Sequence, residues 1–178
     1  MAFESDTYIC LDVPDPHSSE VMAIRRRHLD EFRSALPVEI TVAGSSGVGV
    51  IESAQDPAEV FGVINSVAAD SAPITARFGE PLRFPGTDIF VLTLEDRVPF
   101  EALHARLATS GIRFKPSPHG FFPHCTLRSR SPVTNGEADD LLGTRIEGGF
   151  VLSELVLYML DKLPMSVLHR VPLTGRSG

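Results

Sequence analysis

The residues best suited to chemistry lie in the segment Phe122-Pro123-His124-Cys125-Thr126-Leu127. Successive side chains of a strand point to opposite faces, so we expect His124 and Thr126 to share one face and Cys125 to point to the other. An imidazole can accept or donate a proton near neutral pH, and a hydroxyl can hydrogen-bond a phosphoryl oxygen. The pair is therefore suited to proton transfer at a phosphate group, whereas the orientation of Cys125 argues against thiol catalysis.

A similar spacing occurs earlier, in Pro37-Val38-Glu39-Ile40-Thr41-Val42. Alternation predicts that Glu39 and Thr41 share one face of this strand, while the apolar residues that alternate with them enter the core. If the two strands face each other, both polar pairs meet at one cleft. His119 precedes the second segment in a loop, where it could also line that cleft; a solvated loop histidine is the favoured alternative.

Hydrophobic periodicity and turn residues place these segments in an alternating order of strands and helices. Strands are predicted over residues 7–13, 38–43, 74–79, 88–95, 122–127, 150–160 and 166–173, with a short one ending at residue 51. Helices are predicted over residues 15–36, from residue 56 onward, and over residues 99–110 and 137–142. The helix from residue 56 has a clear start, because Asp56 can cap free amides, Pro57 fits the first turn and Glu59 can reach back.

The order of elements in the first half recurs from residue 88 onward. This repeat predicts an α+β fold of two pseudo-symmetric lobes, roughly residues 1–87 and 88–174, with antiparallel sheets flanking a central cleft. Residues 1–174 are predicted as a single domain and residues 175–178 as a C-terminal tail.

The two motif segments resemble those of the two-histidine (2H) phosphoesterases, the family of bacterial 2′-5′ RNA ligases and cyclic phosphodiesterases. His124-Cys125-Thr126-Leu127 is similar to the family's motif of histidine, any residue, threonine and a hydrophobic residue. Glu39-Ile40-Thr41-Val42 is similar to the other copy of that motif, with Glu39 in place of the histidine. The closing segments, residues 155–158 and 167–173, also look like the usual ending of the family.

The resemblance implies a phosphoesterase that acts on a 2′,3′-cyclic or 2′-5′-linked nucleotide or RNA-end phosphodiester, without a metal or a cofactor. His124 would transfer a proton, and Thr126 and Thr41 would bind the phosphate. The second proton-transfer position would fall to Glu39.

Glu39 leaves more than one interpretation open. A carboxylate beside an anionic phosphate is unfavourable unless it is protonated, and a protonated carboxyl could serve as a general acid. Alternatively, the substitution marks a non-catalytic module that binds nucleotides or RNA ends. A third interpretation is an interaction protein whose motif is vestigial. A positioned acid or base typically contributes about 10²–10⁴-fold in rate, so a protein that lacks one would retain slow activity or only bind its ligand.

Composition narrows the class of partner. The formal net charge of −7 argues against binding along extended nucleic acid, which favours a basic surface. A small nucleotide or an RNA end needs only a local cluster of donors. Two cysteines without C-x-x-C spacing indicate reduced thiols in a cytoplasmic protein. No apolar stretch reaches the length of a membrane span, and no metal-ligand spacing is present.

Overall fold

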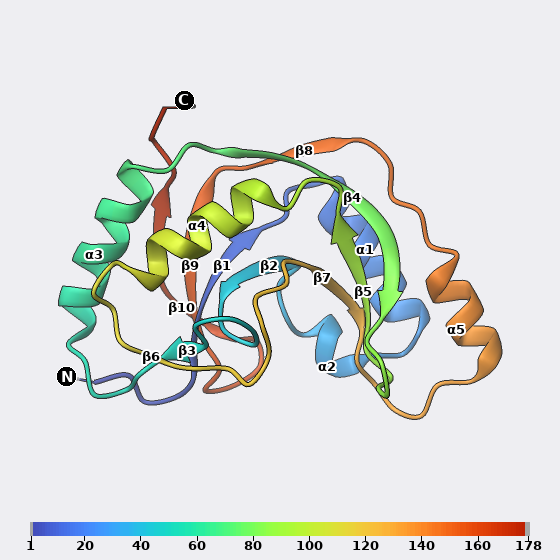
Figure 1. Ribbon diagram of the computed structural model, residues 1–178. Coiled ribbons are helices and arrows are strands. Elements are labelled where there is room, and N and C mark those ends of the chain that lie inside the picture. The colour runs from blue at the N-terminus through green and yellow to red at the C-terminus, as the bar shows by residue number, and fades with distance from the viewer. Residues whose placement is uncertain (1, 177–178) are drawn as a thin grey trace.

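Apolar residues in short runs give this chain strands with buried side chains, and those strands pair into two antiparallel sheets (Figure 1). The computed structural model describes residues 2–176. The first sheet contains β1 (Thr7–Asp12), β2 (Glu39–Ala43), β3 (Val50–Ile51), β6 (Phe114–Lys115), β9 (Glu154–Met159) and β10 (Ser166–Pro172). The second contains β4 (Ile74–Arg83), β5 (Phe90–Leu94), β7 (Cys125–Arg128) and β8 (Gly149–Leu152). The predicted α+β class with antiparallel sheets is confirmed.

Five helices accompany the sheets in the described part of the chain: α1 (His17–Arg27), α2 (Glu31–Ser34), α3 (Pro57–Ala69), α4 (Val98–Ala108) and α5 (Asn135–Leu142). Two of them each follow a strand of one sheet and contact a strand of the other. Helix α1 follows β1 but contacts β7, and α4 follows β5 but contacts β2. The two motif strands, β2 and β7, also contact each other, so these helices help to hold the sheets together where the motifs meet.

The sheets do not follow the expected boundary between residues 87 and 88. Strand β4, from the first half of the chain, pairs with β5 and β8 in the second sheet. Strands β6, β9 and β10, from the second half, belong to the first sheet. The repeated order of elements is therefore real around β1–β2 and β5–β7, but each half of the chain exchanges strands with the other.

The helix expected over residues 15–36 is two helices. Helix α1 ends at Arg27, Leu29 adopts a left-handed backbone with φ of 54°, and α2 begins at Glu31. Asp30 favours the new start, because its carboxylate accepts a hydrogen bond from the amide of Arg33. The apolar periodicity continues across this break, which is why the sequence pattern reads as one helix.

The strand expected over residues 150–160 is also divided. Strand β8 pairs with β4 in the second sheet, whereas β9 pairs with β1 and β10 in the first. Both parts carry apolar residues on their buried faces, so a continuous apolar pattern hides the passage from one sheet to the other. The closing hairpin is nevertheless present as the antiparallel pair β9–β10.

The predicted start of α3 is confirmed: Asp56 accepts a hydrogen bond from the amide of Ala58, and Pro57 is the first helical residue. The expected tail, residues 175–178, lies partly outside the described residues. Its first residue is attached, because the amide of Gly175 donates to the carbonyl of Ser71. Within residues 2–176, no helix combines the length and apolar character needed to cross a bilayer.

Candidate active site

A cavity of about 680 Å³ is lined by the two motif strands and the loops beside them. Glu39 and Thr41 of β2, His124 and Thr126 at β7, and His119 all line it. The structure thus brings together the residues that the sequence predicts for the site. The strand alternation that placed them is present, since Ile40, Val42, Cys125 and Leu127 are buried in the core.

The remaining lining is largely apolar and comes from the α2 segment, the β4–β5 and β9–β10 hairpins and the loop before β7. The prominent residues are Phe32, Phe84, Pro85, Ile89, Phe122, Tyr158, Leu160 and Met165. Small-molecule sites usually enclose about 300–1,000 Å³ and combine apolar walls with a few polar groups. The size and lining of this cavity therefore suit a nucleotide.

The first motif contains an internal hydrogen bond. The Thr41 hydroxyl donates to Oε2 of Glu39 at 2.8 Å. A hydroxyl has only one proton to donate, so in this arrangement Thr41 offers a ligand lone pairs and no donor. Replacement of the expected histidine by Glu39 therefore alters the neighbouring phosphate-binding hydroxyl as well as the proton-transfer position.

The second motif presents one free ring nitrogen. Nδ1 of His124 lies 2.6 Å from the carbonyl oxygen of Phe122. A carbonyl can only accept, so Nδ1 carries the proton, and Nε2 remains for a ligand. Burial lowers the pKa of His124 against the raising effects of the Phe122 carbonyl and Glu39. The ring of Phe84 contributes to that burial, since it packs edge-on at a centroid distance of 5.2 Å.

His119 lies at the exposed rim of the same cavity. Its carbonyl accepts from the amide of Gly47, and its own amide donates to the hydroxyl of Ser117. The first of these bonds joins the loop that carries His119 to the loop that follows β2. His119 is therefore a cleft residue by position, on a loop outside the two motif strands.

The two cysteines are buried and free, and both are poor nucleophiles here. Burial raises the pKa of the Cys125 thiol to about 12. Burial and the neighbouring Glu39 also raise the pKa of Cys10. Because the thiolate is the reactive form, both side chains act as packing groups at neutral pH.

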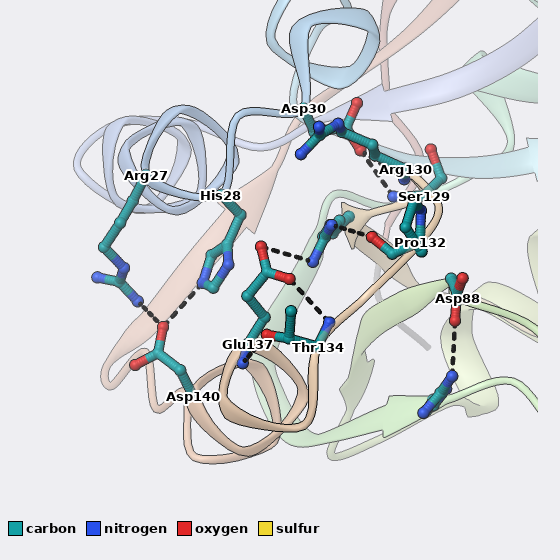
Figure 2. Close-up of polar contacts among 12 residues, drawn as sticks. Arg27, His28, Asp30, Asp88, Ser129, Arg130, Pro132, Thr134, Glu137 and Asp140 are labelled. Carbon is teal, nitrogen blue, oxygen red and sulfur yellow. Dashed lines mark hydrogen bonds and ion pairs between the residues drawn. The ribbon is translucent and has the colours of Figure 1, made fainter.

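Two histidines outside the motif segments stabilise the scaffold of the site. His28 is buried and bonds Asp140 at 2.8 Å, next to Arg27 (Figure 2). The Nδ1 atom of His104 bonds the carbonyl of Val42 at 2.7 Å, and its ring stacks on Phe121. His104 therefore helps to fix the end of the strand that carries the first motif.

Three consecutive arginines, residues 25–27, include one that is fully buried. Arg25 is 1% exposed and donates both Nε and Nη2 to the carbonyl oxygen of Thr126. Its Nη1 donates to three carbonyls of the segment that precedes Glu39, those of Arg33, Leu36 and Pro37. One guanidinium thus ties β7 to the segment leading into β2.

Replacing Arg25 with methionine should lower the free energy of unfolding by about 2–4 kcal/mol, because buried carbonyls would lose charged donors. Urea unfolding of both proteins would measure this difference. Arg26→Met is the matched control, since Arg26 is exposed on the same helix and its loss should change stability by less than about 0.5 kcal/mol. Equal stability of the two variants would contradict the structural role of Arg25.

The site also contains a residue that sequence reasoning missed. Arg33 lines the cavity from α2, together with Glu39 of β2 and with His124, which immediately precedes β7. Its position depends on Asp30, whose other carboxylate oxygen accepts from the amides of Ser129 and Arg130 just after β7 (Figure 2). A capping aspartate inside an apparent helix was the available signal, because aspartate favours helix starts over helix interiors.

Comparison with known proteins places this site in a family. The sequence model of the 2′-5′ RNA ligase superfamily matches residues 13–161, which include both motif strands. The chain belongs to this superfamily. The predicted resemblance to the 2H phosphoesterases is confirmed, and membership supports a phosphoesterase-type role. Comparison with curated protein sequences gave no match.

Solved structures share the fold over nearly the whole chain. TT0787 of Thermus thermophilus has a TM-score of 0.62 and 12% identity, with 97% of this chain and 100% of that chain covered. LigT of E. coli in apo form has a TM-score of 0.58 and 17% identity, with 96% and 98% covered. At these identities the likeness shows a shared fold.

Proposed function

We propose that the protein is a phosphoesterase that hydrolyses 2′,3′-cyclic or 2′-5′-linked nucleotide or RNA-end phosphodiesters. One observation carries the proposal: a carboxylate and an imidazole, each with a threonine two residues later, line a single cavity. Two proton-transfer groups can deprotonate the attacking water and protonate the leaving oxygen, and two hydroxyls can hydrogen-bond the phosphoryl oxygens.

The protonation states of His124 and Glu39 decide which of them acts as the general acid and which as the general base. With Nδ1 bonded to Phe122, neutral His124 offers only an acceptor, and ionised Glu39 also offers only acceptors. One of the two must therefore carry a proton for acid–base catalysis. We assign Glu39 as the base and the His124 imidazolium as the acid, because a carboxylate is ionised at a lower pH than an imidazole.

The reaction then follows in one displacement. Glu39 takes a proton from the attacking water while the water oxygen forms a bond to phosphorus. The bond from phosphorus to the leaving ribose oxygen breaks, and His124 Nε2 gives that oxygen a proton. Thr126 donates a hydrogen bond to a phosphoryl oxygen, and Thr41 does so once its proton turns away from Glu39. These side chains supply the proposed chemistry without a metal ion.

The rate of cyclic phosphodiester hydrolysis should be greatest at acidic pH. The reaction needs protonated His124, and burial lowers the pKa of that residue below its ordinary value of about 6.5. As pH rises above the lowered pKa, kcat/KM should fall about tenfold per pH unit. Initial rates with adenosine 2′,3′-cyclic phosphate between about pH 4.5 and 8 would measure this limb. A rate that rises through pH 7 would refute the assignment of His124 as the acid.

A second function, nucleotide or RNA-end binding without turnover, is favoured by one contact. Because Thr41 donates to Glu39, the first motif lacks a free phosphate donor in the unliganded arrangement. Binding of 3′-AMP without hydrolysis of any cyclic or 2′-5′-linked substrate would identify this function. Failure to bind 3′-AMP or inorganic phosphate at all would leave an interaction protein with a vestigial motif.

The expected ligand is small. E. coli LigT, which shares the fold, has been crystallised in complex with 3′-AMP and with phosphate. The net charge of −7 favours contact with one nucleotide or an RNA end over contact along a strand. The buried free thiols of Cys10 and Cys125 support our proposal of a cytoplasmic location.

A further inference from the structure

The negative charge of Glu39 would repel an anionic ligand in the cavity unless a nearby positive charge offsets it. A phosphodiester is an anion, and Glu39 adds a second negative charge to the first motif. Among the lining residues described within 2–176, Glu39 is the one carboxylate and Arg33 is the one lysine or arginine. Arg33 is therefore the available counter-charge for a phosphate in this cavity.

Arg33 is held in place by the corner where α2 meets the end of β7. Its Nε donates to the Ser129 hydroxyl at 2.9 Å, and its amide donates to Oδ1 of Asp30 at 2.9 Å. Oδ2 of Asp30 accepts from the amide of Ser129 at 2.7 Å, so both anchors of Arg33 belong to one network. The base of the guanidinium is thus fixed before a ligand arrives.

The outer part of the guanidinium has no hydrogen-bond partner. Within residues 2–176, neither Nη atom of Arg33 makes a hydrogen bond or an ion pair, although Nε does. Burial lowers the pKa of Arg33, which means that the charged group is partly withdrawn from water, while Glu39 acts in the opposite direction. Arg33 also contributes to the lowered pKa of His124. Its charge therefore acts on both motifs of the cavity.

We propose that Arg33 binds the phosphoryl oxygens of the ligand through its Nη groups and supplies the positive charge that offsets the negative charge of Glu39 in the first motif. This inference rests on the proposed function of the cavity as a phosphate site. A guanidinium suits the task, because its planar donors match phosphate geometry and it stays charged at every physiological pH. A fixed Nε and two free Nη groups leave the outer donors available to one ligand.

The primary test compares Arg33→Gln with Arg130→Gln. Both variants remove one positive charge from the same corner, but Arg130 is exposed and does not line the cavity. Inorganic phosphate is titrated into each protein and followed by amide chemical shifts in NMR spectra, with neutral adenosine as a second probe. We expect Arg33→Gln to weaken phosphate binding by about tenfold or more and to leave adenosine binding nearly unchanged. Arg130→Gln should keep the phosphate affinity of the wild type within about twofold.

Two further variants separate charge from geometry. Ser129→Ala removes the anchor of Nε but keeps the guanidinium, so phosphate binding should weaken by less than in Arg33→Gln. Arg33→Lys keeps the charge and should retain part of the affinity. If Arg33→Gln unfolds, which its melting temperature would reveal, the Ser129→Ala and Arg33→Lys series still tests the proposal. Wild-type affinity in both of those variants would overturn it.

An electrostatic readout distinguishes ligand binding from a merely structural role. Removal of Arg33 should raise the pKa of His124, measured by NMR titration of its ring protons, because a like charge disappears. Unchanged phosphate affinity and an unchanged His124 pKa in Arg33→Gln would overturn the proposal even if the enzyme is active. If Arg33→Gln selectively loses phosphate binding and no protein in the series shows turnover, the role of Arg33 in phosphate binding would be supported. The proposed phosphoesterase function would then be refuted.

Discussion

His124→Ala should lower kcat/KM for a 2′,3′-cyclic nucleotide by about 10²–10⁴-fold, the usual contribution of a positioned acid. The melting temperature should change little, because within residues 2–176 the ring makes one hydrogen bond, to the Phe122 carbonyl, and the residue lines the cavity. Steady-state rates at several pH values, with thermal unfolding of each protein, would test both expectations. The variant should also lose the decline in rate toward neutral pH, since the group that titrates is gone.

The control should be another histidine-to-alanine substitution at a position outside the cavity. His169→Ala is suitable, because His169 bonds Asn65 and stacks on Phe61 away from the cavity. Its activity should match that of the wild type. Substantial activity in His124→Ala would move the proton transfer elsewhere, and His119 at the rim of the cavity would be the next residue to replace.

The sequence was sufficient for the motif strands because strand alternation is a local property. His124 and Thr126, like Glu39 and Thr41, have a spacing of two residues, and the structure places both pairs around one cavity. The helix start at Asp56 was equally predictable, since its cap involves residues next to each other in the chain. Side-chain alternation and helix capping depend on neighbouring residues, so they can be predicted without knowledge of the tertiary contacts.

Contacts between segments that are far apart in the chain could not be predicted from local sequence patterns. Asp30 begins a new helix and bonds the amides of Ser129 and Arg130, which lie in the other half of the chain. Without that link Arg33 reads as one more charge on a helix surface. The same holds for Arg25, which is buried because the Thr126 carbonyl lies beside it, while the next two arginines are exposed. Three consecutive arginines therefore differ in solvent exposure, although the sequence gives no sign of it.

The passage of the chain between sheets was hidden for a related reason. Strands β8 and β9 are both apolar on their buried faces, so their periodicity does not reveal that each joins a different sheet. The hydrogen bond from Thr41 to Glu39 was also invisible, because it depends on side-chain rotamers and not on strand direction. That bond changes the chemistry expected of the first motif.

Glu39→His should move the pH profile of the enzyme upward and increase its affinity for phosphate. Under the proposed mechanism an imidazole replaces the carboxylate base, and an imidazole becomes a competent base only at higher pH. The acid limb of kcat/KM should therefore shift toward neutral pH, and the optimum should follow. Affinity should rise because the negative charge is lost and the Thr41 hydroxyl no longer has a carboxylate to donate to.

Glu39→Gln is the matched control for this variant, because it removes the charge and keeps the size of the side chain. It should bind phosphate more tightly than the wild type and yet lose about 10²–10⁴-fold in rate, since an amide cannot act as a base. If Glu39 instead marks lost chemistry, Glu39→Gln should cost nothing and Glu39→His should exceed the wild type at every pH. Rates for the three proteins between about pH 4.5 and 8, with phosphate titrations, separate these outcomes. Absence of both turnover and phosphate binding in all three would refute a phosphate site in this cavity altogether.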